Sequence, residues 1–337
     1  MKMFGWLPSV ALVSAFLFTN SSAFATGADY DGNGFAEVPV ITTSSNGTFE
    51  WRLFDPVSGN VSLFTSGLGR PGDQLILANW IYSKVTSAGA LSRPTQHSGG
   101  RLVWTIRTLV RKNGQSSVLE HRKFLGRRGE IIITGGDFNG DGFADALVLT
   151  NRGAGKYTWG LRGNFFQSSY NPGLNQNRAY FPFGRWGVDK PFFLNPDGKR
   201  DWFAVLSCTA SSTCSVVLTQ PFTQQTRSFS VGPVADPSRV PIPVGQDDGT
   251  DLLGFVSDTG ASTSITFKNL RGATVRSVTV PLQGTVTVGN YGPGPGEEVC
   301  VSANGTFVVL NPITGRSTTL SGPVGLAADS ININTIF

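Results

Sequence analysis

The chain has 337 residues, of which 42 are Gly and 19 are Pro, while 39% are hydrophobic and 15% are charged. So much Gly and Pro excludes a protein built mainly of long helices, and the apolar content allows a large buried core and excludes a disordered chain. The net charge is only +5, and there are two His and three Cys. Nucleic-acid binding, histidine-based hydrolysis and a Cys/His zinc site are therefore not expected.

The first 25 residues have the three parts of a secretory leader. Lys2 supplies positive charge, residues 10–18 form an apolar run with one Ser, and Ala23-Phe24-Ala25 is a small-x-small cleavage site. The run is too short for a membrane span, and no later stretch reaches about 18 apolar residues. The sequence predicts a signal peptide over 1–25, a mature domain over 26–337, and a secreted or periplasmic protein with no membrane span.

An internal repeat organises the mature chain. Segment 46–80 aligns almost end to end with 304–337, since both begin with NGTF and end in an apolar strand. Further copies of that strand recur at intervals of about 45 to 60 residues. The six copies lie at 75–80, 130–135, 190–194, 240–244, 285–288 and 331–337.

Each copy is followed by an acidic or Gly-rich turn, a second strand, a third strand that often carries Trp or Phe, and a fourth strand. Four antiparallel strands with a period near 50 are typical of a β-propeller blade. The sequence therefore predicts an all-β fold, a single β-propeller with six four-stranded blades, and seven is the alternative. The second unit lacks an acidic turn after Trp80, so it is either a degenerate blade or an insertion.

The two ends of the mature chain complement each other. The chain enters at the turn that begins with Asp29 and lacks the preceding strand, whereas it ends with such a strand at 331–337. Pairing that C-terminal strand into the first blade would close the ring and remove an exposed sheet edge.

Two nine-residue turns carry a calcium-binding pattern. Residues 29–37 read DYDGNGFAE and residues 137–145 read DFNGDGFAD, with oxygen side chains at positions 1, 3, 5 and 9 and Gly at positions 4 and 6. Calcium takes six to eight oxygen ligands, and Gly permits the sharp bends of such a loop. The alternative is a pair of metal-free hairpin turns. The predicted ligands are Asp29, Asp31, Asn33, the Phe35 carbonyl and Glu37 in the first turn, and Asp137, Asn139, Asp141, the Phe143 carbonyl and Asp145 in the second.

Three further turns, at 195–201, 245–251 and 289–298, depart from this pattern and are expected to bind no metal. Two cysteines, Cys208 and Cys214, flank a five-residue polar turn between apolar runs, so a disulfide is predicted in an exported chain, with two free thiols as the alternative. Cys300 stands between two valines and is expected to be buried in a strand.

The phrases GDFNGDGFADALVL and DYDGNGFAEVPVI, with the recurring NGTF and LG..GD elements, resemble the FG-GAP/VCBS repeat proteins, which include the head of the integrin α-subunit. The resemblance is sharp at 29–41 and 134–150. It implies a propeller with calcium on loops between adjacent strands of a blade. It also implies a role as an adhesion module, a lectin or the scaffold of a polysaccharide lyase, so it leaves the function open.

Three functions follow as expectations. The first is a monomeric binding module with structural calcium, whose partner is a glycan or a cell-surface protein. The second is a lectin that stacks sugars on exposed aromatic rings, although most of these rings are expected to pack between blades. The third is a lyase, which needs a base beside a cation cluster. The ring candidates are Trp51, Trp104, Trp159, Trp186 and Trp202, and the lyase candidates are His97, His121, Tyr157, Arg127 and Arg128. No catalytic or ligand-binding residue is assigned.

Overall fold

The computed structural model describes residues 29–82, 85–92, 99–112, 115–151, 153, 155–163, 166, 180–211, 213–292, 296–324, 326–327 and 333–335. The predicted leader over 1–25 and His97 lie outside the described residues. Within them, the structure contains no helix with the length and apolar character that crossing a membrane requires.

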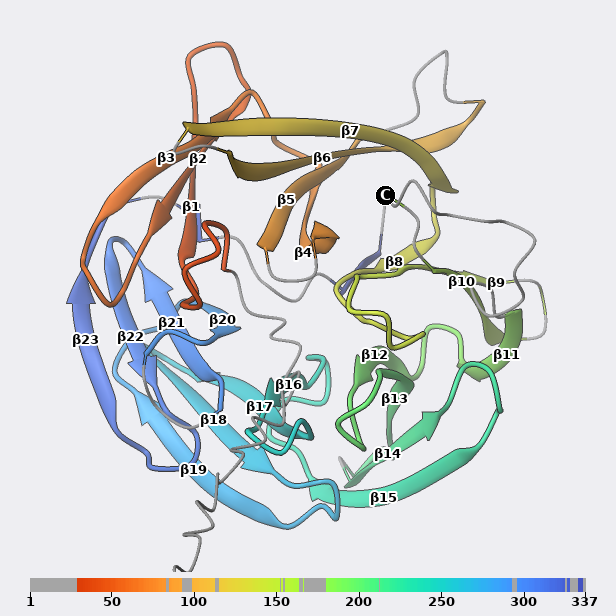
Figure 1. Ribbon diagram of the computed structural model, residues 1–337. Helices are drawn as coiled ribbons and strands as arrows, with labels where there is room; N and C mark the ends of the chain where they lie inside the picture. Colours follow the sequence, from red (N-terminus) through yellow and green to blue (C-terminus); the bar gives the residue numbers. More distant parts are fainter. Residues whose placement is uncertain are drawn as a thin grey trace, which may run out of the picture.

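The strands form six sheets arranged as a ring of blades, so the protein is an all-β six-bladed propeller (Figure 1). Neighbouring strands in every blade are antiparallel. Blade 1 contains β1 (Val38–Thr43), β2 (Phe49–Phe54), β3 (Val61–Ser66) and β24 (Leu326–Ala327). Blade 2 contains β4 (Gln74–Tyr82), β5 (Val85–Ser92), β6 (Arg101–Lys112) and β7 (Gln115–Arg127). Blade 3 contains β8 (Ile131–Ile133), β9 (Ala146–Asn151), β10 (Lys156–Arg162), β11 (Tyr180–Arg185) and β25 (Ile333–Thr335).

The last three blades are regular four-stranded sheets. Blade 4 contains β12 (Lys190–Leu194), β13 (Trp202–Cys208), β14 (Thr213–Thr219) and β15 (Thr226–Pro233). Blade 5 contains β16 (Ile242–Gly245), β17 (Asp251–Thr259), β18 (Ser262–Lys268) and β19 (Thr274–Val280). Blade 6 contains β20 (Thr285–Gly289), β21 (Glu298–Ala303), β22 (Thr306–Leu310) and β23 (Ser317–Ser321). The predicted inner strands of blades 2 to 6 are confirmed as β4, β8, β12, β16 and β20.

Ring closure by a C-terminal strand is confirmed, but the predicted segment was wrong. The strand that pairs with β1 is β24, through Val40 with Ala327 and Ile41 with Leu326. Within 331–337, the described residues 333–335 form β25 and pair with β8 instead. β24 follows β23 after four residues, the same spacing as between β19 and β20, so the chain pairs with β1 before it reaches residue 331.

The second unit is a blade and not an insertion. No acidic turn is needed between β4 and β5, because β5 follows β4 after two residues. Its outer strands, β6 and β7, are the longest of the described strands and cross the edge of the ring (Figure 1). Since β5 pairs with β6 only over residues 88–92 and 103–107, the rest of the β6–β7 hairpin extends beyond the blade as a two-stranded ribbon.

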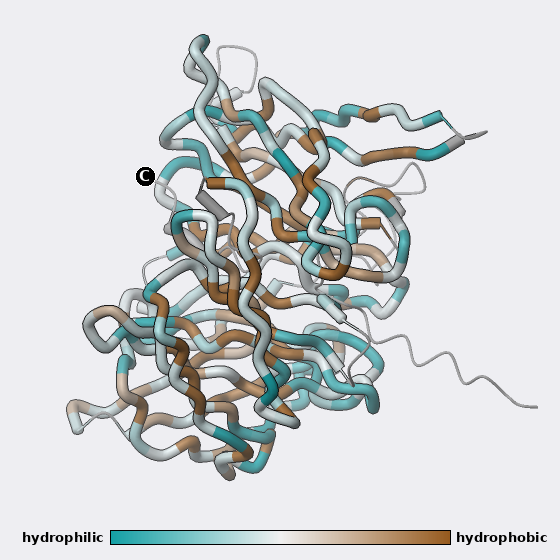
Figure 2. Tube along the Cα trace, turned by 90° about the vertical axis from the view of Figure 1, so that its left-hand side faces the viewer, coloured by the Kyte–Doolittle hydropathy of each residue, from teal (hydrophilic) through white to brown (hydrophobic). Residues whose placement is uncertain are grey.

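The core lies between blades, where apolar side chains of adjacent sheets meet. Apolar segments run through the body of the molecule and hydrophilic ones lie in its loops and edges (Figure 2). At the seam between the first and last blades, the rings of Phe54 and Phe307 lie 4.5 Å apart. The prediction that most of the candidate rings pack between blades is confirmed for four of the five tryptophans, so these four are not exposed for stacking on sugars. Those four, each at most 2% exposed, are Trp51, Trp104, Trp159 and Trp202. Trp186 is half-buried and packs on Tyr157.

A circle of backbone hydrogen bonds joins all six blades. In each case, a residue in or just after the final part of an inner strand, or in the equivalent place in blade 1, offers its carbonyl oxygen to an N–H near the start of the second strand of the next blade. The bonds, from N–H to carbonyl, are Thr86 to Asp29, Ala144 to Asn79, Asp201 to Asp137, Asp251 to Asn195, Glu297 to Gly245 and Ala36 to Asn290, with lengths from 2.7 to 3.0 Å. Each bond satisfies buried backbone groups at a blade boundary.

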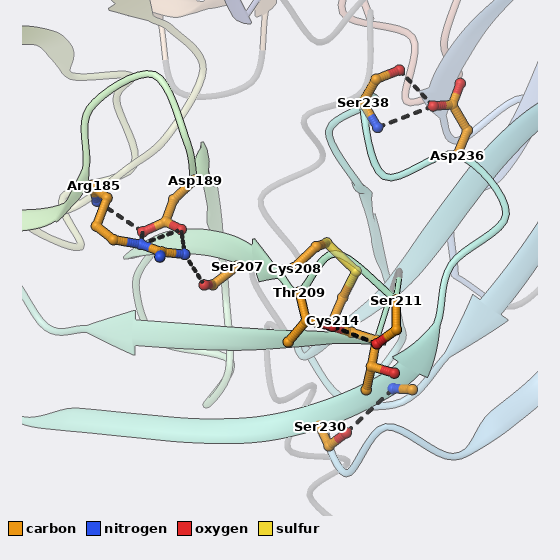
Figure 3. Close-up of a disulfide and its surroundings, with 12 residues drawn as sticks. Arg185, Asp189, Ser207, Cys208, Thr209, Ser211, Cys214, Ser230, Asp236 and Ser238 are labelled. Atoms are coloured by element: carbon orange, nitrogen blue, oxygen red, sulfur yellow. Dashed lines mark hydrogen bonds and ion pairs between the residues drawn. A yellow bond between two sulfur atoms is a disulfide. The ribbon is translucent and has the colours of Figure 1, made fainter.

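The β13–β14 hairpin of blade 4 carries a disulfide (Figure 3). Cys208 and Cys214 are register partners at its end, and the structure joins their sulfur atoms. The predicted burial of Cys300 is confirmed, since it lies in β21 with its side chain fully buried.

We expect peptide mapping of the native protein without reductant to recover one cross-linked fragment that contains Cys208 and Cys214. Replacing both by Ser should lower the free energy of unfolding by about 2 kcal/mol, because the closed loop is short and restricts the unfolded chain only modestly. Alkylation of both thiols in the native protein before reduction would contradict the bridge.

Candidate metal centre

The first acidic turn (29–37) is folded around the carboxylate of Asp29. The N–H groups of Gly32, Asn33 and Gly34 donate to it at 2.6, 3.2 and 3.0 Å. At the far end of the turn, the N–H of Tyr30 donates to Glu37 at 2.8 Å. The backbone can converge on one carboxylate because Gly32 and Gly34 adopt φ values of 75° and 93°, which most residues avoid.

The second acidic turn (137–145) repeats this arrangement in blade 3. The N–H groups of Gly140, Asp141 and Gly142 donate to Asp137 at 2.7, 3.1 and 2.7 Å. The N–H of Phe138 donates to Asp145 at 3.0 Å. The shared residue pattern therefore produces one backbone conformation twice.

The first acidic turn gathers three carboxylates. One oxygen from each of Asp29, Asp31 and Glu37 lies within 4.8 Å of the other two. Burial raises the pKa of Asp29, and it raises that of Glu37 to about 8, with the neighbouring acidic charges adding to both shifts. Carboxylates held this close repel one another unless a proton or a cation lies between them. A set of hard oxygen donors in a partly buried loop fits calcium.

The remaining predicted ligands of the first turn lie within it. The side-chain oxygen of Asn33 accepts a hydrogen bond from the N–H of Phe35 at 2.7 Å, and Asp31 accepts one from the N–H of Asn33 at 3.0 Å. The geometry thus keeps the predicted donors in one short loop. A neighbour that the sequence did not predict is Arg111 of β6, whose guanidinium lies 2.9 Å from the second oxygen of Asp31. Arg111 belongs to the ribbon of blade 2, which passes beside this turn.

In the second acidic turn, the carboxylates at the first and last positions are more deeply buried than those of the first turn. Asp137 and Asp145 are buried, and burial raises the pKa of Asp137 to about 6. Asp141 is exposed, and its carboxylate accepts hydrogen bonds from the Asn139 amide at 2.9 Å and from the Phe143 N–H at 3.0 Å. Among the described residues, only the first turn brings three carboxylate oxygens within 4.8 Å. Calcium in the second turn stays a prediction from its matching backbone.

In the three turns that depart from the calcium pattern, a carboxylate from one blade caps the preceding blade. Asp201, Asp251 and Glu297 each accept a 2.6 Å hydrogen bond. The respective donors are the N–H groups of Asp137, Asn195 and Gly245. Each of these carboxylates stands on a residue whose own N–H belongs to the circle of bonds between blades. No sequence pattern signals this role, because the donor and the acceptor come from different repeats.

Two of the capping carboxylates have raised pKa values. Burial raises the pKa of Asp201 to about 8, and it raises that of Asp251 well above its usual range, with the charges of Asp201, Glu297 and Asp248 adding to the shift at Asp251. A folded-state pKa above the unfolded one means that the native state holds its proton more tightly. The contribution to stability is therefore complete below about pH 4 and is lost as the pH rises towards the folded-state pKa.

We expect the free energy of unfolding of the Asp251→Asn variant, compared with that of the parent, to increase as the pH rises from 5 to 7. The amide keeps an oxygen for the N–H of Asn195 but has no proton to lose, so the variant should gain about 1 kcal/mol over the parent between pH 5 and pH 7. Urea unfolding at the two pH values measures this difference. A parent and variant with the same pH dependence would show that Asp251 titrates normally.

Those lyase candidates that the structure describes do not form a cluster. The hydroxyl of Tyr157 in β10 is buried and donates to the Asp189 carbonyl at 2.7 Å. His121 and Arg127 lie on β7, the outer strand of another blade, and Arg128 follows it. Asp189 also holds Arg185, which reaches Ser207 of blade 4 (Figure 3). The tyrosine therefore belongs to an interblade network and does not face His121.

No protein-family model matches the sequence, and no curated protein matches it. Two solved structures resemble the fold. TolB from Acinetobacter baumannii has a TM-score of 0.51 and 11% sequence identity, over 88% of this chain and 67% of that one. A candidate 6-phosphogluconolactonase from Bacteroides uniformis has a TM-score of 0.51 and 10% identity, over 87% of this chain and 96% of that one. At such low identity these likenesses concern the fold alone: the chain is a six-bladed β-propeller similar to those of TolB and of lactonase-type proteins.

Proposed function

We propose that this protein is an exported, calcium-stabilised β-propeller that acts as a binding module and has no catalytic activity. The observation that carries the proposal is the triad of Asp29, Asp31 and Glu37, held within 4.8 Å in a turn that backbone hydrogen bonds already organise. A cation there would neutralise acidic groups that raise one another's pKa. It would also fix the turn that offers the Asp29 carbonyl to blade 2.

Export is supported by the leader-like first 25 residues and by the disulfide between Cys208 and Cys214. Disulfides persist in oxidising compartments and are rare in the cytosol. The finer relationship that we propose is to the FG-GAP/VCBS repeat proteins, supported by the two acidic turns in equivalent blade positions. In that reading, calcium shapes a loop face of the propeller and is not a reactant.

Calcium-dependent binding tests this function directly. We expect the labelled mature protein to bind a subset of glycans on an array in calcium, and to lose most of that signal in chelator or as the Asp29→Asn variant. The loss follows because an unneutralised triad loosens a turn that joins blades 1 and 2. An array that stays blank in calcium, or signals that chelator leaves unchanged, would count against a calcium-dependent binding module.

A further inference from the structure

A cavity of 660 Å³ lies between blades 1 and 2. The segment 67–73, which joins β3 to β4, forms one wall, and the end of β5, the first half of β6 and the facing part of β7 form the other. In a blade of antiparallel strands, this connection lies at the opposite end from the acidic turns. The cavity therefore belongs to the other face of the propeller and is separate from the metal centre. Its volume is in the range of small-molecule binding sites.

The wall at 67–73 is fixed in place before any ligand arrives. Phe49 exchanges backbone hydrogen bonds with Gly67 and Gly69 at 2.8 and 3.0 Å, and the indole N–H of Trp51 donates to the Leu68 carbonyl at 2.8 Å. Gly69 has a φ of 83°, and a Cβ atom there would lie 3.0 Å from the Cβ of Ala90. The close approach thus requires glycine. The wall at 67–73 is therefore held in one conformation without a ligand.

The second wall is built on one arginine. Arg107 donates to the Thr65 hydroxyl at 2.7 Å and to the Ser66 carbonyl at 2.6 Å, and it pairs with Glu120 at 2.8 Å. Its side chain is only 19% exposed. These contacts bind blade 2 to β3 of blade 1. Arg107 therefore stabilises the wall, and most of its N–H donors are already engaged.

Two other arginines line the cavity, and their guanidinium groups have N–H donors available to a ligand. Arg122 pairs with Glu120 through its Nε atom at 3.1 Å, and its side chain is 65% exposed. Arg70 is exposed, and its backbone N–H donates to Asp73 at 3.0 Å. Within the part of the chain that the structure describes, neither the terminal nitrogens of Arg122 nor the side chain of Arg70 has a hydrogen-bond or ion-pair partner. Such forked donors match a carboxylate.

The rest of the lining narrows the ligand class. The described lining residues include no aromatic ring, so a nucleobase has nothing to stack on. Thr48, Ser92 and Thr105 supply hydroxyls, and Glu120 and Asp73 supply carboxylates. These acids accept hydrogen bonds from ligand hydroxyls, and they disfavour densely charged anions such as polyphosphates. Three arginines against two acids leave one net positive charge.

We propose that this cavity binds a carboxylated saccharide, a short uronic-acid oligomer, through Arg70 and Arg122. One carboxylate takes the forked guanidinium donors, and the sugar hydroxyls are held by the threonine, serine and acidic side chains. This proposal rests on the proposed function, because it names the ligand class and the surface of the binding module. The metal centre lies at the other end of the blades, so calcium would act on the cavity only indirectly, through the acidic turn that joins blades 1 and 2.

Isothermal titration of the mature protein in calcium with tri-galacturonate tests the site. We expect binding that is at least tenfold weaker in the Arg70→Gln, Arg122→Gln double variant and that falls as salt rises. The fully methyl-esterified trisaccharide, which has the same sugars without the charges, should bind at least tenfold more weakly than the acid. Arg122→Lys, which keeps the charge but loses the fork, should be intermediate.

The matched control is Arg316→Gln, an exposed arginine in blade 6 that is not part of the cavity, and it should bind as the parent does. The replaced arginines are exposed, so melting temperatures should be close to that of the parent. No binding of tri-galacturonate by the parent, equal binding of acid and ester, or an equal loss in the control would overturn the site. If the array still shows calcium-dependent binding of other glycans, this inference fails while the proposed function stands; if the array is blank as well, both fail.

Discussion

Removal of residues 326–337 should destabilise the propeller by about 3 kcal/mol or more, because it leaves β1 without its inner partner. The side chains of Val38, Val40 and Ile41 are at most 3% exposed. Uncovering aliphatic groups of this size costs roughly 1.5–3 kcal/mol each when exposure is complete. Unpaired backbone groups on β1 also form a sheet edge open to association. Single domains commonly have about 5–15 kcal/mol to lose, so the truncated chain should melt well below the parent and aggregate.

A second truncation identifies which segment is responsible. Ending the chain after residue 330 removes β25 but keeps β24, and it should cost clearly less than the longer truncation. Melting temperature and light scattering of the two truncated proteins give the comparison. If the shorter truncation is as damaging as the longer one, residues 331–337 supply the closing strand as the repeat alignment predicted. If neither matters, the contacts between blades 6 and 1 close the ring without a C-terminal strand.

Calcium should raise the free energy of unfolding by roughly 2.7 kcal/mol per occupied turn at about 100-fold excess over its dissociation constant. The gain is expected because the triad of Asp29, Asp31 and Glu37 is partly buried and carries acidic groups with raised pKa values. Magnesium should give a smaller gain, since it prefers an octahedral and water-rich site. Urea unfolding in chelator, calcium and magnesium measures the effect.

Asp31→Asn is the informative variant, because the amide can still accept the hydrogen bond from Asn33 but brings no charge to the cation. It should remove most of the calcium response that the first turn provides. Any response that remains and is removed by adding Asp141→Asn would belong to the second turn. Arg111→Gln removes the ion pair with Asp31 without removing a ligand, so it should retain the response. If the double variant responds to calcium as the parent does, the ion binds elsewhere.

The blade pattern could be predicted from the sequence because the inner strands are short apolar runs and, except in blade 2, are followed by a turn rich in Asp, Asn and Gly. That signal located β8, β12 and β20 to within a few residues. The same signal failed at the C-terminus, where two candidate strands, at 326–327 and 331–337, compete for one position. The structure pairs the earlier segment, β24, with β1, and a repeat aligned by its apolar residues alone does not reveal that choice.

The candidate metal turn was also predictable, because its ligands, its glycines and its bends are local in sequence. Arg111 and the cavity were not predictable, since Asp31 and Arg111 are 80 residues apart and Arg70 and Arg122 come from adjacent blades. The length of the β6–β7 ribbon was hidden for another reason. β7 mixes polar, charged and apolar residues without a regular alternation and is exposed or only half-buried throughout, so its sequence does not mark how far the ribbon extends.

The circle of bonds between blades uses only main-chain atoms, and this separates the architecture of the ring from the chemistry of its turns. The residues whose N–H groups take part include Ala36, Thr86 and Asp251, which have little in common as side chains. A turn can therefore exchange a cation-binding sequence for a capping carboxylate, or the reverse, while the same two backbone atoms remain joined. The scaffold tolerates diversification one blade at a time, so the acidic turn of blade 1 should be transplantable into blade 4, 5 or 6 without opening the propeller.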